Sequence, residues 1–410
     1  MSLMFSYLKI NRLLSLQQPI IERFFYKFYT MKKGNRILQS VIILLMIGAT
    51  GCTYYERPGK GGGSEPEPLP DPAFIGSDQC ALCHQEIYND FSESGHPFIL
   101  SKVEDGTAPE RPFTSMDYTP PYFQNDWNDI SYAVGGFAWK YQFLDNDGFV
   151  YTGNDAQYNF LDNSVSAYHD GVAPGTEIYD CGKCHTTGWK SITDGGSPQD
   201  GLAGMGGEFF AEGVQCEACH GMANRHVLSG GDKTEISVDP NATACAQCHY
   251  GNEDHSIAAA DGFIVNHAQF DEMTAAGHKD LSCIDCHNPH ASVKHGQTDG
   301  ITATCTDCHT DMNNPTHNGA DCLTCHMPYA TKSGSMVNKY VADMKTHIFK
   351  INPAEDGEMF NEDGTIAIGS TGVTLDYVCY QCHRDSKGVG GDKSIKTLKS
   401  LSTKATGYHD

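Results

Sequence analysis

One pentapeptide, C-x-x-C-H, recurs eight times in this chain of 410 residues and constrains its fold more than any other feature. The copies use sixteen of the seventeen cysteines, so the chain has no cysteines left for a disulfide framework. They begin at Cys80, Cys181, Cys216, Cys245, Cys283, Cys305, Cys322 and Cys379. Their irregular spacing argues against a solenoid, and from Cys181 onward it leaves too little chain between motifs for independent domains.

The motif has the residue types that attach haem covalently. Its two cysteine sulfurs add to the haem vinyl groups, and the adjacent histidine becomes the proximal ligand of the iron. Structural zinc also uses C-x-x-C pairs. Eight such pairs, each followed by histidine, would arise by chance at only about one in 10 to the 10 or 11. We therefore expect eight haem c groups, attached to Cys80, Cys83, Cys181, Cys184, Cys216, Cys219, Cys245, Cys248, Cys283, Cys286, Cys305, Cys308, Cys322, Cys325, Cys379 and Cys382.

The chain has nineteen histidines, which is enough to give every iron a distal histidine ligand besides the proximal one. The proximal ligands are expected to be His84, His185, His220, His249, His287, His309, His326 and His383. The expected distal ligands are His96, His169, His226, His267, His278, His290, His317 and His347. His255, His295 and His409 are expected to have other roles. An iron with two histidine ligands has no room for substrate and favours electron transfer.

Some of these histidines lie too close in sequence to a motif to reach the far face of that motif's own haem. His290 follows His287 by three residues, and His226 follows His220 by six. We expect such histidines to bind the iron of a neighbouring haem. His278 and His317, each five residues before a motif, are expected to bridge consecutive haems in the same way.

Several blocks around the motifs resemble the cytochrome c-554-like family of multihaem cytochromes. They are Gly76 to His84 with Glu86 to Tyr88 and Ser94 to His96, Tyr168 and His169 with the Cys181 motif and Thr186 to Trp189, Gly213 to Gly221 with Arg225 and His226, Gly262 to Ile264 with His267, Cys283 to His290, and Thr346 to Pro353. The resemblance implies electron transfer between stacked haems, and it implies that His96 is a distal ligand. The founding family carries four haems and this chain has eight motifs, so the haem path cannot be transferred directly.

The N-terminal region resembles a bacterial lipoprotein signal. Basic residues near Met31 precede an apolar stretch, Ile37 to Ile47, which is too short to span a bilayer permanently. Small residues then lead to Cys52, which we expect to be lipidated; cleavage without lipid is the alternative. Residues 1–51 are therefore assigned to the signal region, with translation expected to start at Met31. Residues 52–75 are assigned to a flexible Gly- and Pro-rich tether.

The fold class expected is a multihaem cytochrome c, mainly irregular, with short helices, a small β-hairpin element and a core of stacked haems. Residues 76–180 would hold the first haem and an aromatic-rich β insert, with a hairpin turn at Asp145 to Gly148. Residues 181–383 would hold seven haems, and residues 384–410 a basic tail that either docks or frays. The formal net charge of −23 disfavours nucleic acid and favours basic proteins or metal cations as partners.

These features predict a carrier that passes electrons through a chain of bis-histidine haems at the cell envelope, in anaerobic or extracellular respiration. The expected partners are other c-type cytochromes, membrane quinol-linked redox proteins and extracellular metal oxides. The expected location is the outer membrane or cell surface, with the periplasm as the alternative. Two other functions stay open: an octahaem reductase of nitrite, hydroxylamine or a sulfur oxyanion, and a subunit of a polymeric filament. A reductase would need an open haem, for which His84 and His185 are the candidates because they border the aromatic interval.

Overall fold

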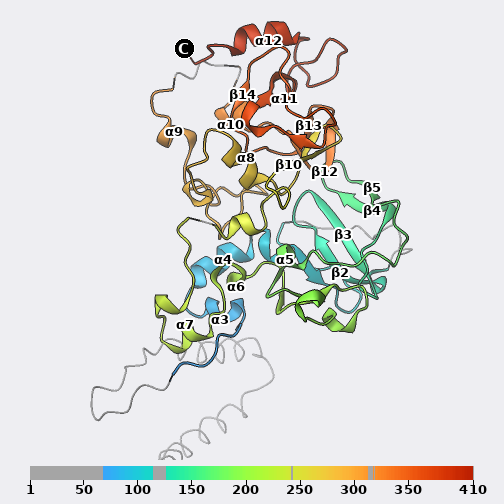
Figure 1. The fold of residues 1–410 in the computed structure, drawn as a ribbon, viewed down its shortest axis with the longest axis vertical. Coiled ribbons are helices and arrows are strands. Elements are labelled where there is room, and N and C mark those ends of the chain that lie inside the picture. The colour runs from blue at the N-terminus through green and yellow to red at the C-terminus, as the bar shows by residue number, and fades with distance from the viewer. Residues whose placement is uncertain (1–67, 114–125, 242, 313–316, 318, 410) are drawn as a thin grey trace, which may run out of the picture. The chain divides into compact units, whose positions relative to one another are not determined.

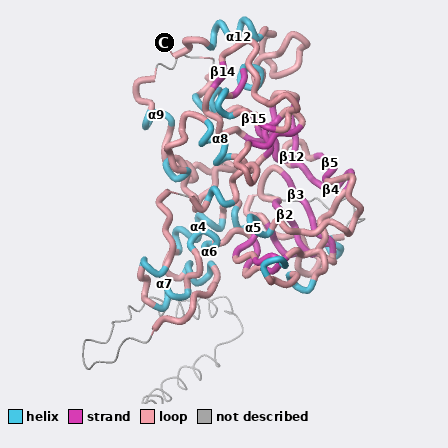
Figure 2. Tube along the Cα trace, viewed as in Figure 1, coloured by secondary structure: helices cyan, strands magenta, loops and turns pink. Residues whose placement is uncertain are grey.

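The structure is a computed structural model that describes residues 68–113, 126–241, 243–312, 317 and 319–409 (Figure 1). The expected signal region, Cys52 and most of the tether lie outside these residues. Within them, no helix is long and apolar enough to cross a membrane. Loops and turns make up most of the trace between short helices and strands (Figure 2).

The first sheet is built from the aromatic-rich interval and has five strands. They are β1 (Leu100–Lys102), β2 (Ile130–Gly135), β3 (Lys140–Asp145), β4 (Gly153–Asn159) and β5 (Ser164–Tyr168). The strands follow in chain order, and each neighbouring pair is antiparallel. Aromatic and aliphatic side chains pack on both faces, including the fully buried Tyr132, Tyr141 and Leu144. Such residues suit a pleated, buried surface.

This sheet is larger than the small hairpin expected from the sequence. The stretch from Ile130 to Leu144 forms two strands rather than one, because Gly135 and Gly136 turn the chain with positive φ angles of 77° and 87°. The turn at Asp145 to Gly148 is present, and the bridge between Leu144 and Val150 closes it.

A second five-stranded sheet, which the sequence analysis did not anticipate, is assembled from distant segments. Its strands are β10 (Ile257–Ala260), β11 (Phe263–Val265), β12 (Thr331–Asn338), β13 (Val341–Met344) and β15 (Ile366–Ala367), in the order β13-β12-β11-β10-β15. β11 pairs with β12 in parallel, and the other pairs are antiparallel. Phe263, Ile264, Ile348 and Val373 are fully buried in its core. The pairing of segments about seventy residues apart explains why no local pattern revealed it.

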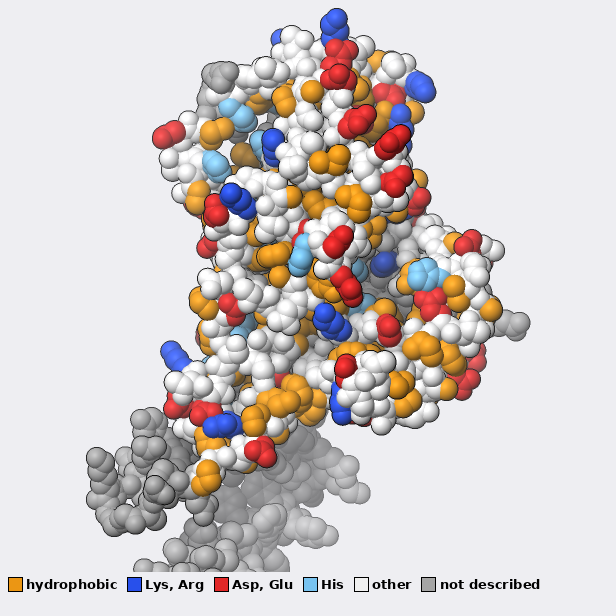
Figure 3. Space-filling view, viewed as in Figure 1, with side chains coloured by type: hydrophobic (Ala, Val, Ile, Leu, Met, Phe, Trp, Pro, Cys, Tyr) orange, Lys and Arg blue, Asp and Glu red, His pale blue; other side chains and the backbone are white. Residues whose placement is uncertain are grey.

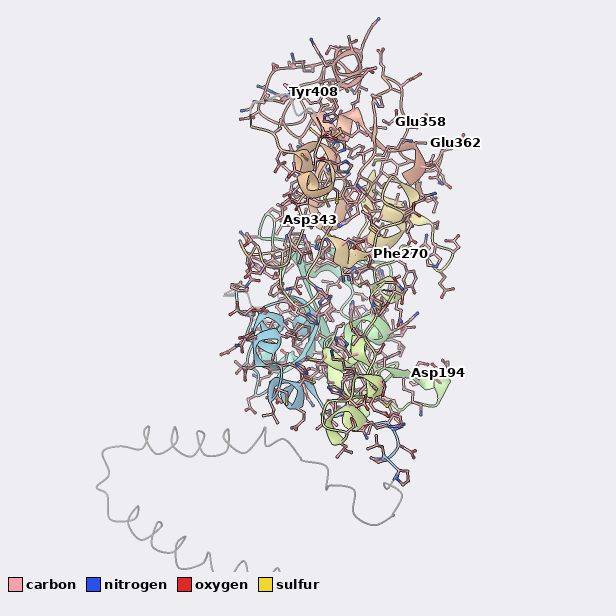
Figure 4. The ribbon with its side chains drawn as sticks, turned by 90° about the vertical axis from the view of Figure 1, so that its left-hand side faces the viewer. Asp194, Phe270, Asp343, Glu358, Glu362 and Tyr408 are labelled. Carbon is pink, nitrogen blue, oxygen red and sulfur yellow. The ribbon has the colours of Figure 1, made fainter. Side chains whose placement is uncertain are left out.

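The two sheets contact each other through a small set of polar groups. The indole nitrogen of Trp139 donates to the carbonyl of Asp343 at 3.1 Å, and the Gln157 amide donates to the carbonyl of Gly334 at 3.4 Å. The carboxylate of Asp343, labelled in Figure 4, accepts the backbone N–H groups of Ser333, Gly334 and Ser335 at the irregular part of β12. These bonds tie the β insert to the C-terminal half.

Most of the remaining elements are single helical turns. The α-helices are α3 (Ser77–Ala81), α4 (Gln85–Ser92), α5 (Gly182–His185), α6 (Cys216–His220), α7 (Asn224–Leu228), α8 (Gln269–Ala275), α9 (Cys305–Cys308), α10 (Cys322–His326), α11 (Leu375–Cys379) and α12 (Leu398–Ala405). The 3-10 turns are η1 (His96–Phe98), η3 (Trp127–Asp129), η4 (Ile192–Asp194), η5 (Gln199–Gly201), η6 (Lys233–Glu235), η7 (Cys245–Gln247), η8 (Cys283–Asp285) and η9 (Gly369–Thr371). Two-residue strands form the pairs β6 (Thr186–Thr187) with β9 (Ala211–Glu212), β7 (Lys190–Ser191) with β8 (Gly207–Glu208), and β14 (Ile351–Asn352) with β16 (Val373–Thr374).

Candidate haem sites

Each C-x-x-C-H motif coincides with, or borders, one helical turn. Residues three apart on such a turn share one face, so both motif cysteines of each pair face the same side. Local capping explains several of these turns. Ser282 with Asp285, and Thr304 with Asp307, form capping boxes in which the N-cap residue immediately precedes the first cysteine. In the same way, the Asp321 carboxylate accepts the backbone N–H of Thr324 at 2.7 Å. The sixteen motif cysteines are free of disulfides in the described part of the chain.

Seven motif histidines each lie beside one histidine from outside the motifs, with the two rings stacked, tilted or edge to face. The ring centres of these pairs are 5.9 to 6.5 Å apart. The pairs are His84 with His226, His249 with His96, His220 with His290, His287 with His347, His309 with His278, His326 with His409, and His383 with His317.

This spacing fits one iron between two imidazoles. With a metal–nitrogen distance of about 2 Å on each side, and about 1 Å from each nitrogen to its ring centre, the ring centres lie about 6 Å apart. Ordinary ring contacts such as Tyr132 with Phe209, at 6.0 Å, reach the same distance. What distinguishes the seven pairs is that each joins one motif histidine to one histidine outside the motifs. The residues present therefore fit haem groups held by two cysteines and two histidines.

Hydrogen bonds orient several of these rings so that Nε2 is left for the iron. The Nδ1 atom of His220 bonds to the carbonyl of Ser237 at 2.7 Å, and that of His326 to the carbonyl of Phe349 at 2.7 Å. The Nδ1 atom of His226 bonds to the carbonyl of Asp232 at 3.0 Å. Such a bond fixes the tautomer and ring orientation of a metal ligand.

Burial favours the neutral form of the paired histidines, which is the form that binds a metal. It lowers the pKa of His347 to about 4, with a smaller contribution from the nearby His287. Burial also lowers the pKa of His96 to about 4, with a smaller contribution from His249. Both rings are therefore neutral near pH 7 and can act as ligands.

A close backbone approach packs the turn that carries His96 against the segment before the Cys216 motif. Gly213, with φ of 67°, lies against the backbone of Pro97, and a Cβ atom there would overlap the Pro97 carbonyl group. The N–H of Val214 donates to the carbonyl of His96 at 3.0 Å. The glycine before the Cys216 motif is thus required to bring this motif against the turn that carries His96.

Six of the eight histidines predicted as distal ligands are brought beside a motif histidine: His96, His226, His278, His290, His317 and His347. His169 and His267 form no such pair among the described residues. His409, which the sequence analysis set aside, lies 5.9 Å from His326. No sequence pattern indicates this contact, because only the folding of the C-terminal segment brings His409 beside the Cys322 motif.

The four histidines that lie outside both the motifs and these pairs share a different environment. His169, His255, His267 and His295 all have positive φ angles, between 43° and 89°. Each has a ring nitrogen bonded to a protein group: His169 to Glu177, His255 to Asp271, His267 to Asn266 and His295 to the carbonyl of Phe137. That His255 and His295 have roles other than iron ligation stays a prediction.

The pairing also links neighbouring motifs, as the short spacings predict. His290, three residues after His287, lies beside His220, and His226, six residues after His220, lies beside His84. His317, five residues before Cys322, lies beside His383 of the last motif. Each of these histidines thus faces the haem site of a different motif from the one it adjoins.

His185, the histidine of the Cys181 motif, has a different environment from the seven others. Its nearest described ring is Tyr179, at 6.4 Å and tilted by 42°. The Nδ1 atom of His185 and the hydroxyl of Tyr179 are buried, and neither has a hydrogen-bond partner in the described structure. Burial and then the charge of Lys140 lower the pKa of His185 to about 4. The same two causes, in that order, lower the pKa of His267 to about 3.

Hydrogen bonds hold pairs of motifs together directly. In the Cys216 motif, the buried carboxylate of Glu217 accepts the backbone N–H groups of Ile75 and Gly76, which lead into the Cys80 motif. At the other end of the chain, the Gln381 amide of the last motif donates to the carbonyl of Thr324 in the Cys322 motif at 3.0 Å.

Comparisons by sequence match two parts of the chain to family models. Residues 156–221 match the family described as cytochrome c554 and c-prime, and residues 275–314 match the doubled CXXCH motif. The multiheme cytochrome MtrA of Shewanella baltica is 24% identical over 147 residues, in a match that covers 25% of this chain and 44% of MtrA. The chain thus spans less than half of that relative.

Comparisons by structure find multihaem proteins. The octaheme sulfite reductase MccA of Wolinella succinogenes has a TM-score of 0.51 at 17% identity, over 79% of this chain and 66% of MccA. The outer cell wall cytochrome OcwA has a TM-score of 0.44 at 18% identity, over 74% of this chain and 85% of OcwA. The likeness to MccA concerns the fold.

Proposed function

Because this chain is a multihaem c-type cytochrome, we propose that it binds eight haems and conducts electrons between them. The single observation that carries this proposal is the set of seven histidine pairs with ring centres 5.9 to 6.5 Å apart. An iron with two imidazole ligands has no free site for substrate, so its chemistry is one-electron transfer. Bound haem supplies the redox centre, and the chain sets its ligands and surroundings.

The contacts between motifs support a continuous path. His226 links the first and third haem sites, His290 links the third and fifth, and His278 links the fifth and sixth. The side chains of Cys305 and Cys322 lie close enough to interact, which joins the sixth and seventh sites, and His317 links the seventh and eighth. We propose that electrons follow these links from the Cys80 end to the Cys379 end.

Contacts between cysteines of different motifs support the same order of haem sites. They also add the second and fourth sites, which the histidine links leave out. The side chains of Cys80 and Cys216 lie within hydrogen-bonding distance of each other, and so do those of Cys245 and Cys283. The side chains of Cys184 and Cys248 are equally close. The second haem site therefore adjoins the fourth, as a branch from the main path.

We place the protein in the cell envelope, attached by lipid at Cys52. The support is the lipoprotein-like signal and the fact that haem is attached to C-x-x-C-H motifs outside the cytoplasm. Its proposed partners are other c-type cytochromes and quinol-linked redox proteins, with extracellular metal oxides as final acceptors. Mass spectrometry of the mature protein tests the anchor by the added mass on Cys52.

Electron paramagnetic resonance (EPR) of the oxidised holoprotein, with and without cyanide, tests the proposed electron-transfer function. Seven or more low-spin irons that do not respond to cyanide are expected. A His290→Ala variant should convert one of these irons to a form that responds, while the His295→Ala control should leave the spectrum unchanged. Fewer than seven unresponsive irons in the unmodified protein would rule out the proposed ligand set.

A second function is favoured by the environment of His185, which lacks a histidine partner at the common spacing. We propose that the iron of this haem keeps an open face that binds a small anion. Lys140 acts electrostatically on both His185 and His267, and it would attract the negative charge. The haem would then end a branch of the path, where electrons could reduce an anionic substrate, nitrite or a sulfur oxyanion; hydroxylamine, which carries no negative charge, fits the site less well.

Binding of nitrite, followed by EPR, separates this site from the conductor. One high-spin iron that shifts on adding nitrite is expected, beside seven that do not change. Lys140→Met should weaken nitrite binding without altering the seven low-spin signals, and Lys190→Met, at an exposed lysine of β7, should have no effect. Eight low-spin irons whose signals do not change on adding nitrite would contradict the open site, while the proposed electron-transfer function would still stand.

A further inference from the structure

The last haem motif lies beside a basic segment on an otherwise acidic chain. Residues 384–404 contain six basic residues and two acidic ones, whereas the chain as a whole has 28 basic and 51 acidic residues. The basic residues are Arg384, Lys387, Lys393, Lys396, Lys399 and Lys404. All are exposed except Lys396, which is half-buried.

Backbone hydrogen bonds fix this segment on the motif itself. The N–H of Lys393 donates to the carbonyl of Cys382 at 2.7 Å, and the N–H of Gly391 donates to the carbonyl of His383 at 3.0 Å. The Nδ1 atom of His383 bonds to the carbonyl of Ser394 at 3.2 Å. Lys393 is therefore held next to Cys382, which is itself exposed.

The helix α12 continues the basic surface. Thr397 caps it by accepting the N–H of Ser400, and Leu401 is buried against Leu375 and Tyr380. Because Leu401 points into the core, the exposed Lys399 and Lys404 lie on the outer side. Figure 3 shows Lys and Arg side chains on the end of the molecule that carries α12.

The acidic groups of the segment cancel only part of this charge. Asp385 is buried, and it accepts hydrogen bonds from the Tyr340 hydroxyl at 2.7 Å and from backbone N–H groups. It also pairs with Lys339 at 3.1 Å. Asp392 is exposed but pairs with Lys393 at 3.4 Å. The outward field of the segment is therefore set by its lysines and Arg384.

We propose that residues 384–404 form a docking surface for an acidic redox protein that exchanges electrons with the haem at His383. This proposal rests on the proposed conduction path, of which that haem is one end. The transfer is a single electron between the iron and the oxidised or reduced centre of the partner, and it moves no proton and breaks no bond. Complementary charge raises the rate of encounter between such proteins.

Charge reversal on the holoprotein tests the surface. The test variant carries Lys393→Glu, Lys399→Glu and Lys404→Glu. The control variant carries Lys190→Glu, Lys233→Glu and Lys279→Glu, which reverse three exposed lysines elsewhere and change the net charge equally. The probe is a reduced, acidic plant-type ferredoxin, whose low reduction potential makes it a one-electron donor. Haem reduction is followed by stopped-flow absorbance at low salt and at high salt.

The test variant should be reduced at least roughly tenfold more slowly than the unmodified protein at low salt, and the difference should vanish at high salt. The control should change less than twofold. Equal slowing in both variants, or none in the test variant, would overturn the proposal. Full haem content and an unchanged low-spin EPR spectrum verify that each variant folds, and the single Lys393→Glu change provides a milder substitute.

Two further measurements distinguish failure of the docking surface from failure of the conduction path and from binding of a second copy of this chain. If the ferredoxin reduces one haem and the electron does not spread to the others, the conduction path fails while the docking surface stands. If the unmodified protein forms a dimer at low salt in ultracentrifugation and the test variant does not, a second copy of this chain occupies the surface. That outcome would overturn the assignment to a separate redox protein.

Discussion

Glu217 holds the first and third haem motifs together, and replacing it should loosen that junction. The side chain is 3% exposed. Its carboxylate accepts the N–H groups of Ile75 at 3.0 Å, Gly76 at 2.8 Å and Ala223 at 2.9 Å. In Glu217→Ala all three donors lose their acceptor, and the segment before the Cys80 motif loses its attachment.

The size of the effect follows from the number of bonds. A hydrogen bond to a charged group contributes about 1.5 to 3 kcal/mol. Three such bonds do not add fully, and water can partly replace them after the change. We therefore expect the free energy of local opening to fall by about 3 to 5 kcal/mol. Because every 1.4 kcal/mol is a factor of ten, amide exchange around Ile75 and Gly76 should accelerate by roughly a hundredfold or more.

Hydrogen exchange followed by mass spectrometry measures this directly on the holoprotein. Peptides covering residues 73–77 and 221–225 should exchange faster in Glu217→Ala, with peptides from the second sheet unchanged. Glu208→Ala is the matched control, because Glu208 accepts one exposed backbone N–H, from Ser197 at 3.2 Å. Exchange at residues 73–77 within threefold of the unmodified protein would refute the reasoning.

Two further predictions concern a ligand pair and pH. His409→Ala should create one iron that binds cyanide, detected by EPR, while His169→Ala should leave all irons as they were; the reverse result would restore the assignment made from the sequence. Hydrogen bonding and charge from Lys102 lower the pKa of Asp200, so this carboxylate stabilises the fold above its ordinary pKa of 3.8 and loses that effect as pH falls. The melting temperature of Asp200→Asn should therefore lie below that of the unmodified protein at pH 6, and the gap should close below about pH 4.

The distal ligands show how far sequence reasoning reaches. His226 and His290 were expected to bind neighbouring haems because their short separation from a motif rules out the motif's own haem, and the structure places both beside other motifs. No comparable argument exists for His409. Its place beside His326 depends on α12 packing against Tyr380 and Leu375, which turns the C-terminus back. His169 carried a family-like context, yet its ring stacks on Tyr168 at 4.0 Å and bonds to Glu177.

The sequence by itself determined the haem attachment motifs, their proximal histidines and the expectation of an exported electron carrier, since covalent attachment needs only a local pattern of five residues. It also indicated β structure in the aromatic interval. Only the tertiary structure decided which histidines meet, because the two histidines of one pair lie up to 153 residues apart, as His249 and His96 do. The second sheet arose in the same way, from strands such as β11 and β12 that pair across a long separation. Distances of this kind are set by packing of the whole chain, and no local pattern encodes them.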